Sequence, residues 1–186
     1  MLWIQNGRFL FCCLGLLRIL GRASTSGPAS PTQRLFDHIL SGYDTSIRPI
    51  RRLGKVTDVE LNSELYTLVS VNEKEGWIET MLWNSMVWTD ELLRWNDSDQ
   101  FSDISYIQLT ANKIWTPDVV VYNAMEHTLH TNMPDSPLDV TIAYVSREGR
   151  VRISQPQRLV QKCNNFDLSD FPFDDQVCAA RYGSFR

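Results

Sequence analysis

The stretch VTDVELNSELYTLVSV, residues 56–71, decides the fold because apolar and polar side chains alternate along it. One face collects the apolar residues and a threonine, namely Val59, Leu61, Leu65, Thr67, Val69 and Val71. The other face collects the polar residues Asp58, Glu60, Asn62, Glu64 and Ser70. A period of two over this length is typical of a half-buried β-strand, and we expect a bulge or break in it near Asn62.

The same period continues after a polar turn from Asn72 to Gly76, which is typical of a hairpin. We expect the next strand over residues 77–88, with Trp83 on one face and Trp88 on the other. Further short strands are expected over residues 104–109, 119–122, 140–146, 150–154, 158–162 and 177–183. The Gly-containing turn at residues 147–150 joins two of these strands as a second hairpin.

A short amphipathic helix is predicted before the strands. Its apolar residues recur at helical spacing, as Leu35, Phe36, Ile39 and Leu40. Pro31 suits its first turn, and Gly42 suits its end. Many short strands and one N-terminal helix predict an all-β protein, an antiparallel sandwich or barrel.

Length and composition fit one globular domain of this kind. The chain has 186 residues, of which 43% are hydrophobic and 11% aromatic, and this argues against disorder. A net charge of −4 gives little support to nucleic-acid binding, so no nucleic-acid partner is expected. After residue 25, no apolar stretch reaches the ~18 residues that a transmembrane helix needs.

The N-terminus is interpreted as a signal peptide over residues 1–23, followed by a flexible leader over residues 24–33. It has an early Arg8, an apolar core and small residues around Ala23, where cleavage is expected. An uncleaved leader or a short anchor is the alternative. Export makes Asn96, in the run Asn-Asp-Ser, a candidate glycan acceptor.

The cysteine count agrees with export. Cys12 and Cys13 lie in the predicted signal peptide and leave with it, so Cys163 and Cys178 remain as an even pair. In an oxidising compartment such a pair favours a disulfide. Two free buried thiols, or half of a metal site, are the alternatives.

Enzymatic chemistry finds no support. The chain has no Gly-rich phosphate loop, no G-x-S-x-G and no H-E-x-x-H motif. Its Glu126-His127-x-x-His130 run has the residue types of a metal site, but it lies in a loop-like stretch. The adjacent Asp174 and Asp175 point to opposite faces if they lie in a strand. We therefore expect neither an enzyme nor a cofactor.

The aromatic residues allow two interpretations. Trp77, Trp83, Trp88, Trp95, Trp115, Tyr122, Tyr144 and Phe185 could be sandwich core, or some could form a box around an organic cation. Aromatic faces attract ammonium groups, and tryptophan attracts them most strongly. Core is the simpler interpretation for Trp88 and Trp115. Composition does not choose between the two for the others.

A resemblance bears on that choice. CNNFDLSDFPFDDQVC, at residues 163–178, resembles the signature loop of Cys-loop ligand-gated ion channels, with the specific tail FPFD-x-Q-x-C. VNEK at 71–74 and the W-x4-W-T-D-x4-W-N run at 83–96 are similar to segments of nicotinic and serotonin-type subunits. So are IWTPDVVVYN at 114–123 and YGSF at 182–185.

This resemblance implies an immunoglobulin-like β-sandwich in a pentamer of homologous subunits, with a small cationic neurotransmitter of the acetylcholine or serotonin class bound between neighbours. The family pattern gives Tyr122 and Phe185 to the principal face of that site. It gives Trp83 to the complementary face. The strand pair around residues 144–154 would supply further contacts of the complementary face, among them Arg152 and Ser154.

The resemblance also implies a coupling surface. Glu73 and the segment Phe171, Pro172, Phe173 and Asp174 would face a membrane domain and transmit binding to a cation-selective pore. The chain would then lie on the extracellular face of the plasma membrane.

The chain departs from the family pattern at three places. Its signature loop is one residue longer than the family's, and Phe185 replaces a tryptophan. The chain also stops at Arg186. Residues 34–186 are therefore expected to be a ligand-binding domain that is incomplete at its C-terminus and carries no transmembrane domain.

Three functional hypotheses remain open. The first is the ligand-binding domain of an acetylcholine- or serotonin-type channel subunit, and we favour it. The second is a secreted binding protein similar to soluble acetylcholine-binding proteins. The third is an adhesion-type sandwich without a ligand, against which the spacing of Trp83 and Tyr122 and the signature loop argue.

Overall fold

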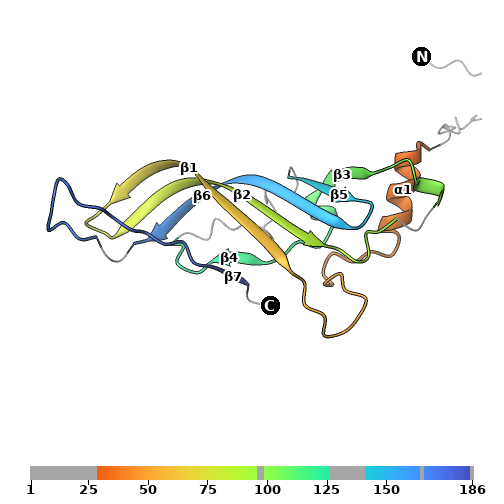
Figure 1. Ribbon diagram of the computed structural model, residues 1–186, viewed down its shortest axis with the longest axis horizontal. Coiled ribbons are helices and arrows are strands. Elements are labelled where there is room, and N and C mark those ends of the chain that lie inside the picture. Colours follow the sequence, from red (N-terminus) through yellow and green to blue (C-terminus); the bar gives the residue numbers. More distant parts are fainter. Residues whose placement is uncertain (1–28, 96–98, 126–140, 164–165, 185–186) are drawn as a thin grey trace, which may run out of the picture.

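The computed structural model describes residues 29–95, 99–125, 141–163 and 166–184 (Figure 1). It contains one α-helix, two short 3-10 turns at Asp99–Phe101 and Ala111–Lys113, and antiparallel strands. In chain order the helix and strands are α1 (Pro31–Leu40), β1 (Val59–Asn72), β2 (Trp77–Thr89), β3 (Tyr106–Thr110), β4 (Val119–Val121), β5 (Ile142–Ser146), β6 (Arg150–Lys162) and β7 (Tyr182–Ser184). A five-stranded sheet has the order β1-β2-β6-β5-β3, and β4 and β7 form a two-stranded sheet. The predicted all-β class with one N-terminal helix is confirmed.

Helix α1 forms where its spacing predicted it. Ser30 caps its N-terminus, because the hydroxyl accepts a hydrogen bond from the backbone N–H of Gln33 at 3.1 Å. Pro31 occupies the first turn, and Leu35 and Ile39 are buried. The helix therefore stands at one end of the molecule and closes that end of the core (Figure 1).

The expected break in β1 is misplaced. The register runs without interruption past Asn62 and Ser63, and the irregularities lie later, between Leu65 and Thr67 and between Leu68 and Ser70. Ser63 is the polar residue on the apolar face, and it needs no bulge because its hydroxyl is hydrogen-bonded to the hydroxyl of Tyr182 at 2.9 Å.

The expectation that β1 is half-buried is also wrong along most of its length. Val59 and Leu61 pack against the main core, but Leu65 and Val69 are 63% and 50% exposed. β1 is the edge strand of its sheet, and the register shifts between Leu65 and Thr67 and between Leu68 and Ser70 change which of its side chains face the core. Alternation thus predicted the strand correctly but not its burial.

Strand β6 was predicted as two strands, over residues 150–154 and 158–162, and is in fact one. It runs through Pro156, which lies opposite Trp83 on β2. Strand β5 pairs only with the part of β6 from Val151 to Ile153. The pairing with β2 runs without a break from Arg150 to Lys162, so it holds β6 as one strand through Pro156.

The last predicted strand is shorter than expected. Only Tyr182–Ser184 pairs, with β4, and residues 177–181 are irregular. Val177 is exposed, so the apolar residues of this stretch did not mark a buried strand.

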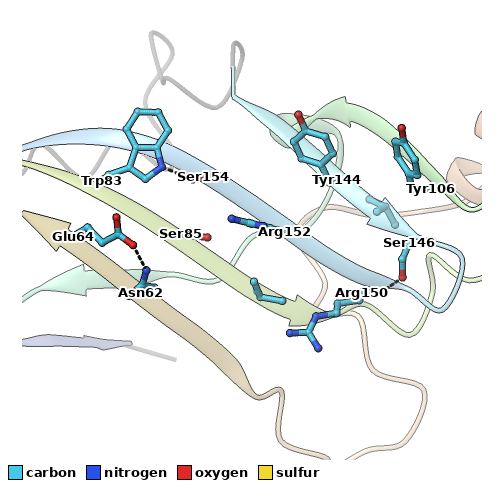
Figure 2. A pocket seen from close by; sticks show the side chains of 12 residues that line it. Asn62, Glu64, Trp83, Ser85, Tyr106, Tyr144, Ser146, Arg150, Arg152 and Ser154 are labelled. Atoms are coloured by element: carbon cyan, nitrogen blue, oxygen red, sulfur yellow. Dashed lines mark hydrogen bonds between the residues drawn. The ribbon is translucent and has the colours of Figure 1, made fainter. Parts of the chain in front are cut away.

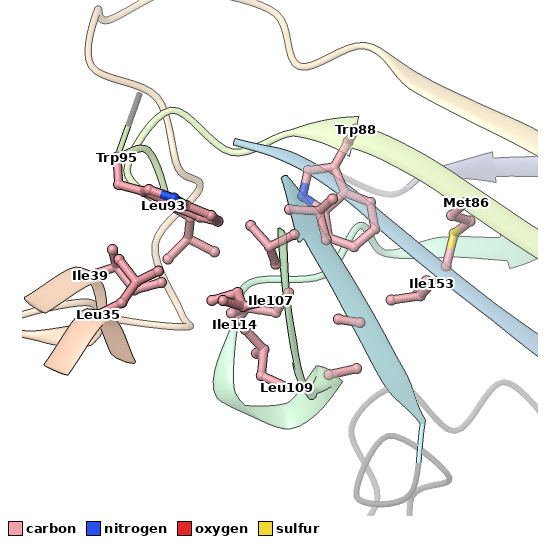
Figure 3. Close-up of a cluster of buried hydrophobic side chains, with 14 of the residues drawn as sticks. Leu35, Ile39, Met86, Trp88, Leu93, Trp95, Ile107, Leu109, Ile114 and Ile153 are labelled. Carbon is pink, nitrogen blue, oxygen red and sulfur yellow. The ribbon is translucent and has the colours of Figure 1, made fainter. Parts of the chain in front are cut away.

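The main core lies between the large sheet and α1 (Figure 3). Trp88 and Trp95 are each 2% exposed, and Trp115 meets Trp88 edge-to-face with centroids 6.2 Å apart. This confirms Trp88 and Trp115 as core residues. Trp83 is on the opposite face of β2 from Trp88, as predicted, and is 46% exposed.

A buried polar contact anchors the core to the segment after α1. The Tyr43 hydroxyl donates to Asp90 Oδ2 at 2.6 Å and accepts from the Trp115 backbone N–H at 3.0 Å. Asp90 Oδ1 accepts from the backbone N–H groups of Leu92 and Leu93. Burial raises the pKa of Asp90, and burial together with the Asp90 bond raises the pKa of Tyr43.

We expect Tyr43→Phe to lower the free energy of unfolding by about 2 kcal/mol, because it leaves a buried carboxylate without its hydroxyl donor. Urea unfolding followed by tryptophan fluorescence measures the effect. Tyr106→Phe is the control, since Tyr106 is 62% exposed and its hydroxyl should contribute less than about 0.5 kcal/mol. Equal losses in both variants would contradict this assignment.

Candidate ligand-binding cleft

An open cleft of about 590 Å³ lies on the outward face of the large sheet (Figure 2). It is built by alternation, because every second residue of a strand points to the same face. Strand β2 contributes Trp83 and Ser85, β6 contributes Arg152 and Ser154, and β5 contributes Tyr144. The remaining lining includes Asn62 and Glu64 of β1, Tyr106 of β3, and Ser146 and Arg150.

Trp83 lines this cleft with its ring held in place. Its indole N–H donates to the Ser154 hydroxyl at 2.6 Å. Ser154 lies on β6 opposite Ser85, two residues along β2 from Trp83. The bond restricts the orientation of an otherwise half-exposed indole ring.

The charged residues of the cleft differ in their partners. Arg150 forms an ion pair with Glu60, with Nη2 and Oε2 3.0 Å apart. Glu64 accepts a hydrogen bond from the Asn62 amide at 2.9 Å. Within the residues described, the Arg152 guanidinium makes no hydrogen bond or ion pair.

Sequence reasoning placed Trp83, Arg152 and Ser154 in one site, and the structure brings all three to this cleft. It missed Glu64, Ser85 and Tyr106. The period of two had already put Glu64 on the polar face of its strand, and counting from Trp83 gives Ser85 the same face. No sequence pattern marks Tyr106 as a cleft residue, because only the pairing of β3 with β5 brings it to the cleft.

Tyr122 lies outside the cleft, directly after β4. Its hydroxyl donates to the backbone carbonyl of Ser184 at 3.0 Å, and the side chain is 54% exposed. A Cβ atom at Gly183 would overlap the Tyr122 ring, so the ring packs directly on the glycine backbone. Trp83 and Tyr122 therefore belong to two different surfaces of the chain. Phe185 and Asn96 lie outside the described residues, as do Glu126, His127 and His130.

Asn123, the residue after Tyr122, binds both ends of the predicted signature loop. Its side-chain amide donates to the carbonyl oxygens of Lys162 and Ala179 at 3.2 and 2.9 Å. Its oxygen accepts from the Arg181 backbone N–H at 3.0 Å. The side chain thus connects the Tyr122 segment to the base of the loop.

Cys163 and Cys178 form the predicted disulfide, with Cα atoms 5.3 Å apart. The base of this disulfide loop meets the β1–β2 turn, where the Cys163 N–H donates to the Gly76 carbonyl at 2.8 Å. Loop and turn share one end of the molecule, and α1 occupies the other end (Figure 1).

The tip of the disulfide loop is highly exposed. Phe171 and Phe173 are 70% and 89% exposed, on either side of Pro172, whose peptide bond is cis. Asp174 accepts a hydrogen bond from Gln176 within the loop. Glu73 lies in the neighbouring β1–β2 turn. These predicted coupling residues thus lie at the same end of the fold.

Two kinds of feature are absent from the described residues. No helix among them is both long and apolar enough to cross a bilayer. In the same ranges, no group of three or more His, Cys, Asp or Glu side chains is arranged to hold a metal ion.

Comparison with known proteins gives consistent matches. Residues 32–186 match the sequence model described as "Neurotransmitter-gated ion-channel ligand binding domain". The 5-hydroxytryptamine receptor 3A of Cavia porcellus is 33% identical over 172 residues, covering 92% of this chain and 33% of that protein. The neuronal acetylcholine receptor subunit alpha-4 of Homo sapiens is 30% identical over 171 residues, covering 92% and 26%. The chain thus spans about a third or less of the length of these relatives.

The contact between Tyr122 and Gly183 gives a testable coupling. We expect Gly183→Ala to displace the Tyr122 ring and to lower the unfolding free energy by about 1–3 kcal/mol, as overpacking does. In a Tyr122→Ala background, Gly183→Ala should lower the unfolding free energy much less. Urea unfolding of the wild type, the two single variants and the double variant measures the difference. An equal cost in both backgrounds would show that the ring does not pack on Gly183.

Proposed function

This chain belongs to the family of neurotransmitter-gated ion-channel ligand-binding domains, and we propose that it binds a small neurotransmitter on the extracellular side of a cation-selective channel. The family is one of receptors of the serotonin and nicotinic type, not of enzymes. The agonist we propose is of the acetylcholine or serotonin class. The single observation that supports this proposal most is Trp83, an indole ring held half-exposed in a cleft.

The chemistry of the cleft supports a ligand with an ammonium group. An indole face attracts organic cations with about 0.5–2 kcal/mol per contact. A tryptophan that served only packing would be buried, as Trp88 is on the other face of the same strand. Trp83 instead stays open to solvent, and the bond to Ser154 keeps its ring in one orientation.

We propose that the complete site forms between two homologous subunits. Trp83, Arg152 and Ser154 form the complementary face, and Tyr122 and Phe185 belong to the principal face. The separation of Trp83 and Tyr122 on two surfaces supports this arrangement, because neither surface by itself encloses a ligand. Repetition of one such contact around a ring gives the pentamer that we propose.

We propose that gating is transmitted through the end of the fold that holds the disulfide loop. The residues that would contact a membrane domain are Glu73, Phe171, Pro172, Phe173 and Asp174. Two exposed phenylalanine rings at a loop tip are costly in water and suit an apolar or protein contact. The hydrogen bonds of Asn123 provide a continuous connection from Tyr122 to the base of that loop.

Trp83→Ala should weaken binding of acetylcholine or serotonin to the purified oligomer at least about tenfold, and Trp83→Phe should weaken it less, because phenylalanine keeps an aromatic face. Titration calorimetry measures the affinity. Tyr66→Ala is the control, since Tyr66 is 80% exposed and lies outside the cleft. Unchanged affinity in Trp83→Ala would remove Trp83 from the site.

The proposed export has its own test. Residues 1–23 act as a signal peptide in this proposal, and Asn96 carries a glycan. The leader predicted over residues 24–33 is shorter than expected, because helix α1 already begins at Pro31. Expression in secreting animal cells should give a product that begins close to residue 24 and loses mass on treatment with an N-glycosidase. Asn96→Gln should abolish the mass loss. An intact N-terminus on the secreted product would contradict the cleavage.

A further inference from the structure

We infer that the loop between α1 and β1 is a binding site for a sulfated polysaccharide, whose sulfate groups are bound by the cations of the loop. The loop has the sequence RPIRRLGK, residues 48–55, with four cations and no acidic residue. It projects from the part of the molecule near α1 (Figure 1). None of its residues lines the ligand cleft, so this site is separate from the function proposed for the cleft.

A carboxylate beneath the loop holds it in shape. Glu91 forms an ion pair with Lys55, and its carboxylate accepts the Arg51 backbone N–H at 2.8 Å. The backbone of Glu91 completes the attachment, because its N–H donates to the Pro49 carbonyl at 3.2 Å and its carbonyl accepts from Arg51 Nε at 3.0 Å. A loop that is fixed at several points loses little conformational freedom when a ligand binds.

The positive charges of the loop face solvent, and the negative charge does not. The side chain of Glu91 is 12% exposed, whereas that of Lys55 is 57% exposed. Arg48 is exposed, and its guanidinium donates to the Lys55 carbonyl at 3.2 Å, a bond that leaves its charge unneutralised. The exposed Arg52 side chain makes no hydrogen bond or ion pair with any described residue. The outer surface of the loop is therefore positive.

The chemistry of these side chains favours an anion with several oxygens. A guanidinium donates two parallel hydrogen bonds to such a group, and it sheds its water more readily than an ammonium group does. Three arginines and a lysine within eight residues are typical of patches that bind heparin or nucleic acids. The loop thus suits a densely charged polyanion.

The rest of the chain favours a thin and flexible polyanion. Outside the loop there are 14 basic and 22 acidic residues. A bilayer or a DNA duplex is a broad anionic surface, and close approach would bring it near many of these acidic residues, which repel it. A linear sulfated polysaccharide contacts the loop alone. Such polysaccharides occur outside cells, on the side where we propose that this domain lies.

Heparin is the probe, and titration calorimetry with the purified full chain measures its affinity between about 50 and about 300 mM NaCl. We expect binding that weakens as the salt concentration rises, because a densely charged chain releases counter-ions when cations bind it. Chemically desulfated heparin, which keeps the sugar backbone and its carboxylates, should bind at least about tenfold more weakly.

Arg52→Gln should lower the affinity for heparin about two- to fivefold, the scale of one exposed ion pair. Adding Arg48→Gln should lower it further and reduce its salt dependence. Arg181→Gln is the matched control, because it removes the same charge from an exposed arginine beside the disulfide. It should leave the affinity unchanged. A thermal melt checks that each variant folds.

Three results would overturn the inference. One is a wild-type chain that does not bind heparin, and another is an equal loss of affinity in Arg52→Gln and Arg181→Gln. The third is stronger binding, at equal salt, to a single-stranded oligonucleotide or to vesicles of phosphatidylserine and phosphatidylcholine. Leu53→Ser should leave heparin binding unchanged, since Leu53 is 97% exposed but uncharged. A loss of heparin binding in Leu53→Ser would indicate an apolar partner and would also contradict the inference.

Discussion

The register between β2 and β6 is the constraint on which the rest of the structure depends. It places Ser85 opposite Ser154 and Val87 opposite Arg152, and it runs unbroken from Trp77 to Thr89. Because side chains alternate across a strand, a slip of one residue would turn Trp83 into the core and Trp88 into solvent. The buried Trp88 holds the register from the core side. The same register builds the cleft on the other face.

This arrangement separates stability from recognition. The core face of the large sheet is sealed by α1 and by the contact of Tyr43 with Asp90, and neither reaches the cleft. The outward face can therefore keep a half-exposed indole, and a guanidinium that has no ionic partner in the described part of the chain, without weakening the core. Asn123 and the Gly76–Cys163 hydrogen bond join the Tyr122 segment and the β1–β2 turn to the disulfide loop. A change at Tyr122 thus has a short covalent and hydrogen-bonded path to the exposed loop tip.

Local patterns predicted the elements well where the physics is local. The helix of α1, both hairpin turns and the opposite faces of Trp83 and Trp88 all follow from spacing over a few residues. The errors arose where a neighbour in space decides. Pro156 suggested a break in β6, yet the strand continues because β2 pairs with it along its whole length. Leu65 and Val69 suggested burial, yet β1 is an edge strand.

The sequence by itself determined the all-β class, the disulfide pair and the family, because alternation, cysteine parity and the signature loop are properties of the chain in order. It also singled out Trp83, Arg152 and Ser154. Only the tertiary structure decided that Glu60 pairs with Arg150, that Arg152 has no ionic partner among the described residues, and that Glu64 lies opposite Trp83. It also showed that Tyr122 lies on a separate surface. These features depend on strand order and register, which bring together residues as distant in sequence as Glu60 and Arg150, ninety positions apart, and leave no trace in local spacing.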